Sequence, residues 1–167
     1  MGSCMFLLSL SSCGSQQHVV SNRYMRDLAR AGIRLGIDIE ERDNHTLLLE
    51  ASKWIGTPYR NGGNSTSGID CSGLTYHIYK NVYKTTLSRR SEDQYHMDVR
   101  LKPGKRLVQG DLLFFNTSRS RKTPCDHVGI YLKEDKFIHA SSSKGVIVSR
   151  LSESYWAKRW VSAGERK

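Results

Sequence analysis

Residues 68–83 read Gly-Ile-Asp-Cys-Ser-Gly-Leu-Thr-Tyr-His-Ile-Tyr-Lys-Asn-Val-Tyr, and this stretch carries the clearest structural pattern in the chain. Leu74, Ile78 and Val82 recur every four residues, which places them on one face of a buried helix. The preceding segment, 58–68, is rich in Gly, Asn, Ser and Thr and predicts a loop. The pattern therefore puts Cys71 at the start of the helix, directly after a glycine-rich loop.

Helical patterns lie before this stretch and strand patterns lie after it. The helical spacings cover 23–35, after a short tether over 14–22, and then 46–55. A further helical turn is expected over 89–96. Beyond it the period changes to short β-branched or aromatic runs with turns between them, over 111–116, 127–132, 136–140, 146–149 and 160–163. Helices followed by hairpin-linked strands predict an α+β domain with an antiparallel sheet.

The position of Cys71 favours a role as a nucleophile. The start of a helix offers unpaired N–H groups and partial positive charge, which favour a thiolate and can stabilise an oxyanion. Such a cysteine needs a base, and the base needs an orienting group. His127 opens one predicted strand and His139 closes the next, so a hairpin can bring both imidazoles to the same region of the sheet. His127 can then pair with Cys71, while His139 fixes the tautomer of His127.

Structural interpretations stand beside these catalytic ones. A cysteine at a helix start is often a small core residue, and a histidine in a strand is often structural. Cys125 is interpreted as a buried small side chain in preference to a redox partner of Cys71. The four cysteines form no Cys-x-x-Cys pair, so a structural zinc site is poorly supported. The other four histidines have no catalytic context and are expected at the surface: His18, His45, His77 and His96.

Five local strings occur in one order along the chain, and together they are far more specific than any one of them. They are Gly56-Thr-Pro-Tyr-Arg-Asn-Gly-Gly63, Gly68-Ile-Asp-Cys-Ser-Gly73, Gln109-Gly-Asp-Leu-Leu-Phe-Phe115, Asp126-His-Val-Gly-Ile-Tyr131 and Phe137-Ile-His-Ala-Ser141. This set closely resembles the NlpC/P60 family of cell-wall cysteine peptidases, over about residues 47–163. The resemblance implies a papain-like α+β fold, with N-terminal helices packed on an antiparallel β-sheet.

The resemblance also implies a Cys-His-His triad that acts through an acyl-enzyme. Cys71 corresponds to the nucleophile, His127 to the general base and His139 to the orienting third member. The implied reaction is hydrolysis of the bond between γ-D-glutamate and a diamino acid in the stem peptides of peptidoglycan. No metal and no organic cofactor is expected.

Three further positions match residues that contact the substrate in the family. Tyr59 matches a tyrosine near the thiol, which can donate its hydroxyl toward the oxyanion or the substrate. Asp70 and Ser72 match positions that line the substrate groove. Asp70 is then a candidate to receive a substrate ammonium group, and capping of the helix is an equally good interpretation. One departure from the family pattern is Arg89, which stands where proline is frequent.

The N-terminus resembles the end of a bacterial lipoprotein signal peptide. An apolar run over 5–10 leads into Leu10-Ser-Ser-Cys13, where Cys13 would be lipidated. The chain would then divide into a signal peptide over 1–13, a tether and N-terminal helix over 14–44, and a catalytic domain over 45–167. No Lys or Arg precedes the apolar run, although export signals normally begin with positive charge, so a Ser-rich leader is the alternative. The expected protein is a monomer in the bacterial cell envelope, periplasm-facing or at the cell surface, and attached to the membrane through Cys13.

The net positive charge of the chain limits the kinds of molecule that it is expected to bind. The chain has 26 Lys and Arg against 16 Asp and Glu, a net charge of +10, and the whole excess lies in residues 45–167. A basic surface suits a carboxylate-bearing wall peptide. Nucleic acid is not expected as a partner, because aromatic residues do not alternate with basic ones in a stacking pattern. Two alternatives of other classes are a lipid-anchored amidase or acyltransferase of the same fold and a non-catalytic cell-wall binding module.

Overall fold

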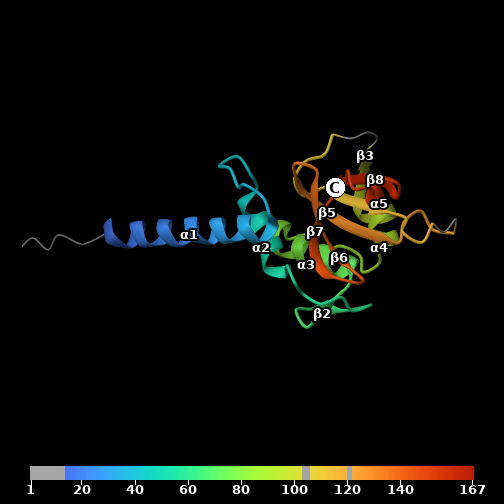
Figure 1. Cartoon of the computed structure of the whole chain (residues 1–167), viewed down its shortest axis with the longest axis horizontal. Helices are drawn as coiled ribbons and strands as arrows, with labels where there is room; N and C mark the ends of the chain where they lie inside the picture. Colours follow the sequence, from blue (N-terminus) through green and yellow to red (C-terminus); the bar gives the residue numbers. More distant parts are fainter. Residues whose placement is uncertain (1–13, 103–105, 120–121) are drawn as a thin grey trace, which may run out of the picture.

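The computed structural model describes residues 14–102, 106–119 and 122–167, in which helices come first and a six-stranded sheet follows (Figure 1). Helix α1 (Gly14–Leu35) projects from the rest of the domain, and its C-terminal part packs on α2 (His45–Trp54). The prediction of a tether over 14–22 is wrong, because α1 already begins at Gly14. After that glycine the segment contains neither proline nor glycine, so nothing interrupts the helical hydrogen bonds. Among the described residues, no helix is both long and apolar enough to cross a bilayer.

Helix α3 (Cys71–Tyr83) confirms the helix that the opening stretch predicts, including its first residue. Asp70 is its N-cap, and its Oδ1 accepts a hydrogen bond of 2.6 Å from the backbone N–H of Gly73. This bond satisfies one of the donors that every helix start leaves free. Leu74 and Ile78 are fully buried, which is the reason that the helix sits firmly against the sheet.

The sheet is antiparallel throughout, with the strand order β3-β8-β4-β5-β6-β7. Its strands are β3 (Val99–Lys102), β4 (Leu112–Phe115), β5 (His127–Lys133), β6 (Lys136–Ser141), β7 (Gly145–Arg150) and β8 (Trp160–Arg166). All but β3 confirm predicted strands. The sequence did not predict β3, because two of its four residues are charged and it pairs only with β8, at the edge of the sheet.

Different elements cover the two faces of the sheet. On one face Val128 and Ile130 join the main core with α2 and α3. On the other face Phe115 and Phe137 pack against Trp156 of α5 (Ser154–Ala157), one turn of helix that the sequence did not predict. Side chains alternate between faces along a strand, so His127 lies on the face that α5 covers.

Two small elements complete the frame around the start of α3. A hairpin of β1 (Asn64–Ser65) and β2 (Gly68–Ile69) lies in the segment predicted as a loop. The helical turn predicted over 89–96 is α4 (Ser91–Asp93), which continues into the π-helical turn η1 (Gln94–Asp98). The fully buried Gln94 accepts a hydrogen bond from the Thr75 hydroxyl and donates one to the Ser72 carbonyl, which ties this turn to α3.

Candidate active site

Cys71 lies where the glycine-rich loop, α3 and β5 meet. It is the first residue of α3 and is buried, with 8% of its surface exposed. Backbone groups of Val128, Ser72 and Cys71 itself lie near its sulfur and favour the thiolate form. Because Val128 directly follows His127 in β5, the contact with Val128 brings the start of that strand next to the thiol.

The two predicted histidines are hydrogen-bonded to each other. His127 Nε2 and His139 Nδ1 lie 3.0 Å apart, and His139 Nε2 lies 3.1 Å from the hydroxyl oxygen of Ser149 on β7. Three neighbouring strands thus supply one chain of polar groups that ends at the His127 ring. Since Nε2 of His127 is engaged, Nδ1 is the ring nitrogen left for proton exchange with a thiol. Sequence reasoning missed Ser149, whose one signal is a polar residue in the apolar run of β7.

Trp156 encloses both imidazoles, and sequence reasoning missed it as well. Its ring stacks on His127, with the ring centroids 5.3 Å apart and the planes at 26°, and it meets His139 edge-on at 4.6 Å. An indole in this position shields one side of both rings from water, while His127 stays half-buried and both rings line the cavity beside Cys71. The only signal in the sequence was a lone Trp between the last two strands.

A cavity of about 440 Å³ joins the predicted residues Tyr59, Cys71, His127 and His139. The rest of its lining is largely polar and includes the run 141–144 at the β6–β7 turn. Tyr59 reaches it because its backbone pairs with Ile69, just before the start of α3. Burial raises the pKa of the Tyr59 hydroxyl, and the nearby charges of Cys71 and Asp70 act in the same direction, so this hydroxyl stays protonated as a donor.

Asp70 and Ser72 flank the nucleophile but do not line that cavity. The Ser72 hydroxyl donates to the carbonyl of Arg89 at 2.7 Å and to Asp70 Oδ1 at 3.1 Å. The guanidinium of Arg89 lies 3.4 Å from both oxygens of Asp70 and donates to the carbonyl of Gly63 at 3.2 Å. Both predicted groove residues are therefore engaged in holding the start of α3, and Arg89 forms an ion pair with the carboxylate of the cap.

Burial favours the neutral forms of the nucleophile and the base. It raises the pKa of the Cys71 thiol to about 11, helped by the negative charge of Asp70 and opposed by the backbone hydrogen bonds. It lowers the pKa of the His127 imidazole to about 4, although the charge of Asp126 acts in the opposite direction. The pKa of His139 is also well below its ordinary value, through burial and the proximity of His127. The free site therefore holds a thiol and a neutral imidazole.

The remaining candidates lie apart from this chemistry. Cys125 is buried and unbridged, and its thiol donates to the carbonyl of Ser91 at 3.6 Å, in agreement with a structural role. His45 bonds to Tyr24 and His77 bonds to Asn64, so neither is a plain surface residue. Cys13 and the predicted signal peptide lie outside the described residues. In the part of the chain that the structure describes, no group of three or more His, Cys, Asp or Glu side chains is arranged to hold a metal ion.

Comparisons with known proteins agree on one family. The family model described as the NlpC/P60 family matches residues 56–165. The chain is 33% identical over 138 residues to the probable endopeptidase NlpC homolog of Haemophilus influenzae, a match that covers 78% of this chain and 71% of that protein. It is 34% identical over 127 residues to the murein DD-endopeptidase MepS/murein LD-carboxypeptidase of Escherichia coli, which covers 76% of this chain and 63% of the relative.

Two further comparisons give a third sequence relative and a solved structure. The gamma-DL-glutamyl hydrolase of Bacillus subtilis is 39% identical over 114 residues, or 68% of this chain and 27% of that protein. A solved NlpC/P60 family protein of Bacillus cereus superposes with a TM-score of 0.66 at 28% identity, over 77% of this chain and 42% of that one. The predicted α+β fold of this family is thereby confirmed, while the matched segments span from 27% to 71% of the three sequence relatives.

Proposed function

This chain belongs to the NlpC/P60 family of bacterial cell-wall peptidases, and on that premise we propose that it is a cysteine endopeptidase acting on peptidoglycan. The finer proposal is that it hydrolyses the bond between γ-D-glutamate and the diamino acid of a stem peptide. The observation that carries it is the meeting of Cys71, at the start of α3, with the hydrogen-bonded pair His127–His139 in one cavity. That arrangement supplies a nucleophile, a base and an orienting group.

In the free enzyme the Cys71 thiol and the His127 imidazole are both neutral. In the acylation step the thiol therefore gives up its proton at the same time as its sulfur attacks the substrate. The sulfur of Cys71 attacks the γ-carbonyl carbon while His127 takes the thiol proton. The oxyanion of the tetrahedral intermediate meets backbone N–H groups at the start of α3 and the hydroxyl of Tyr59. As the carbon–nitrogen bond breaks, the imidazolium of His127 gives its proton to the departing amine of the diamino acid.

Water completes the cycle. His127 is neutral again after the amine leaves, and it takes a proton from a water molecule that attacks the thioester carbonyl. The carboxylic acid departs and the thiol recovers its proton. Throughout, His139 and Ser149 hold the His127 ring in one orientation, so its tautomer is fixed before the substrate arrives.

The lining of the cavity favours a stem peptide over the lipid substrate of an acyltransferase. The hydroxyl groups of the three serines over 141–143 and of Thr117, with the ammonium group of Lys144, belong to residues that line the cavity beside Cys71. These groups can bond to the carboxylates of a stem peptide, whereas an acyl chain would leave them desolvated and unpaired. The presence of all three members of the triad argues against a purely wall-binding module.

Digestion of defined muropeptides, with the products identified by mass spectrometry, tests the proposal. Release of a fragment that begins with the diamino acid supports the γ-D-glutamyl bond. Conversion of a cross-linked dimer into monomers would instead assign a DD-endopeptidase, and loss of a single C-terminal residue from a tetrapeptide an LD-carboxypeptidase. Failure to cut any of the three substrates would exclude the enzymatic assignment.

Attachment to the envelope is a separate proposal. We infer that Cys13 is lipidated and holds the enzyme on a bacterial membrane, since the string Leu10-Ser-Ser-Cys13 follows an apolar run. Expression in a bacterial host with a labelled fatty acid should mark the native chain and leave the variant Cys13→Ser unmarked. Equal labelling of the two chains would contradict the anchor.

A further inference from the structure

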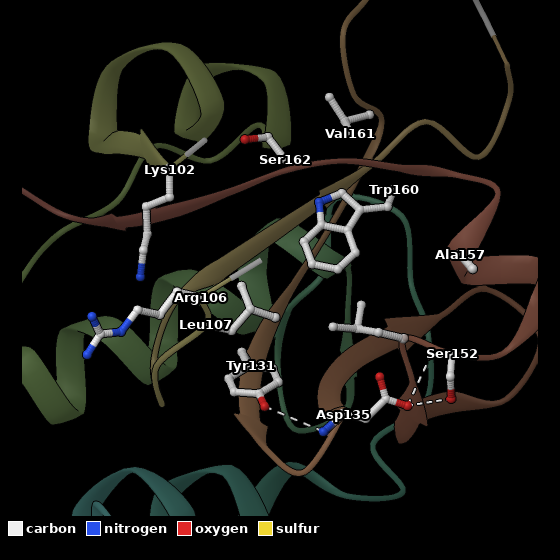
Figure 2. Close-up of a pocket in the computed structure, with 11 residues that line it drawn as sticks. Lys102, Arg106, Leu107, Tyr131, Asp135, Ser152, Ala157, Trp160, Val161 and Ser162 are labelled. Carbon is white, nitrogen blue, oxygen red and sulfur yellow. Dashed lines mark hydrogen bonds between the residues drawn. The ribbon is translucent and has the colours of Figure 1, made fainter. Parts of the chain in front are cut away.

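A second cavity has a volume of about 900 Å³ (Figure 2). Tyr131 in its wall and His127 lie an even number of positions apart along β5, so the cavity lies on the same face of the sheet as His127. The two residues are four positions apart along the strand, or about 13 Å at the rise of a strand. Ala157 of α5 lines this cavity, whereas the adjacent Trp156 lines the catalytic one. One turn of helix therefore separates the two, and a single extended polymer is long enough to occupy both.

An irregularity in the sheet shapes this second cavity. Phe114 of β4 pairs with Ser162 of β8, but Phe115 pairs with Trp160, so β8 carries one extra residue, Val161. In a regular strand, successive side chains point to opposite faces. Here the bulge lets Trp160, Val161 and Ser162 all line the same cavity, which is how bulges re-aim side chains beside binding sites.

The cavity places aromatic rings next to a hydrogen-bond acceptor. The rings of Trp160 and Tyr131 are both partly exposed in its wall, and Asp135 lies at its edge (Figure 2). The Asp135 carboxylate accepts a hydrogen bond from the backbone N–H of Ser152 at 3.1 Å, and a carboxylate has lone pairs for further donors. Glu134 and Asp135 have positive φ values of 51° and 69°, as the two-residue turn between β5 and β6 requires, so the backbone that carries this acceptor is fixed by the hairpin.

The two cationic side chains of the cavity differ in whether they already have a partner. Lys102 lies 2.7 Å from the buried carboxylate of Asp111, so its charge is already compensated. Arg106 is exposed and has no hydrogen bond or ion pair with any of the described residues. Its guanidinium can therefore form a bidentate pair with an incoming carboxylate.

We propose that this cavity binds a saccharide unit that bears no stem peptide and therefore has a free acidic substituent, on the same wall polymer from which a neighbouring stem peptide enters the catalytic cavity. The face of a sugar ring packs on the aromatic rings, its hydroxyl groups donate to Asp135, and its acidic substituent pairs with Arg106. A lipid or an apolar peptide would desolvate the Arg106 guanidinium and the remaining lone pairs of Asp135 without offering either group a new partner. The identity of the polymer rests on the proposed function, whereas the chemistry of the cavity does not.

Calorimetric titration of the inactive variant Cys71→Ala tests the binding directly. The probes are the peptide-free disaccharide of N-acetylglucosamine and N-acetylmuramic acid, and the neutral disaccharide diacetylchitobiose. We expect the acidic disaccharide to bind more tightly than the neutral one. Adding Trp160→Ala should weaken the binding of both at least 10-fold, whereas adding Arg106→Gln should weaken only the acidic one.

Matched variants guard against a trivial result. Trp160→Phe keeps an aromatic ring and should retain most of the binding. Lys80→Gln removes an exposed charge on α3, far along the chain from the cavity lining, and should leave the binding of both disaccharides unchanged. Absence of binding in the parent protein at millimolar disaccharide, or binding that neither Trp160→Ala nor Arg106→Gln alters, would overturn the proposal.

Activity assays separate this inference from the proposed function. In an otherwise native chain, Trp160→Ala should leave hydrolysis of soluble stem peptides unchanged and slow the digestion of intact wall sacculi several-fold. An enzyme that cuts stem peptides but binds no disaccharide would refute the second site alone. A protein that binds the disaccharide but cuts no stem peptide would refute the peptidase assignment and leave the saccharide site standing.

Discussion

Single residues decide the protonation state of the site, and Trp156 is the clearest case. Its indole packs against both imidazoles and so reduces the solvation of their charged forms by water. The neutral His127 that results is the form a general base needs. Neither the indole nor Ser149 behind His139 belongs to the predicted triad, yet the proposed mechanism depends on both.

The nucleophile and the base should be indispensable. Cys71→Ala and His127→Ala should each lower kcat/KM for stem-peptide hydrolysis by roughly 10³-fold or more, because loss of either group leaves no covalent route. His139→Ala should cost less, roughly 10- to 100-fold, since orienting an imidazole is easier to replace than the base itself. Full turnover by purified Cys71→Ala or His127→Ala would disprove the assigned roles, and unchanged circular dichroism spectra should show that the variants are folded.

Opening the site to water should shift the pH profile. His127 has a pKa lowered to about 4 by burial, so the neutral base persists well below pH 6.5. Trp156→Ala should admit water, raise that pKa toward its ordinary value and move the acid limb of kcat/KM upward by one pH unit or more. Trp156→Phe is the matched control and should keep most of the native profile. An acid limb that stays in place in Trp156→Ala would mean that the indole does not set the basicity.

Among the elements, α3 has a start that several side chains hold in place. Asp70 caps the helix while Arg89 holds both carboxylate oxygens of that cap. The start of the helix is thus fixed by groups outside it, and the backbone donors beside Cys71 are set in place before any substrate binds. Pre-set donors of this kind need no rearrangement when an oxyanion forms.

The contribution of the Asp70 cap to stability should be measurable. Asp70→Ala should lower the free energy of unfolding by about 1 kcal/mol, in line with lost N-caps in other proteins. Asp70→Asn keeps an acceptor for the Gly73 N–H and should lose less. Denaturant titrations of the two variants give the comparison, and equal stability of Asp70→Ala and the native protein would show that the cap is dispensable.

The elements also show how far the sequence can predict the structure. The strict four-residue spacing after Cys71, and the compact apolar runs of β4 to β7, depend on local pattern, and their positions were predicted correctly. Edge strand β3 has no apolar run, and the turn α5 is four residues long, so neither has a period to detect. Trp156 and Ser149 reach the site only through tertiary packing, and the cavity beside β8 depends on a register shift that no spacing in the sequence indicates.

For the molecule as a whole, buried histidines couple stability to pH. Above pH 6.5, His127 and His139 are neutral in both the folded and the unfolded chain. As the pH falls from 6.5 toward 4, the unfolded chain takes up protons that the folded chain does not, because burial keeps the pKa of both rings low. Stability is therefore lost over this interval.

That loss should be visible in a stability profile. The free energy of unfolding should fall with decreasing pH between 6.5 and 4 by up to about 1.4 kcal/mol per pH unit for each such histidine. The double variant His127→Gln/His139→Gln should fall less steeply. A further loss is expected below about pH 4 from Asp126, whose pKa is lowered because hydrogen bonds from Thr117 and Ser118 outweigh the effect of burial. Identical slopes for the double variant and the native protein would contradict the buried neutral pair.

The projecting helix α1 sets a length scale for the enzyme. Its 22 residues extend for about 33 Å at the rise of an α-helix. If Cys13 carries a lipid, the length of this helix limits the distance from the bilayer at which the catalytic cavity can act. Deleting two helical turns would bring the catalytic cavity about 11 Å closer to the membrane and would change no catalytic group. Cells carrying such a shortened chain would then digest only the innermost layer of the wall, whereas the detached domain would attack isolated sacculi as before.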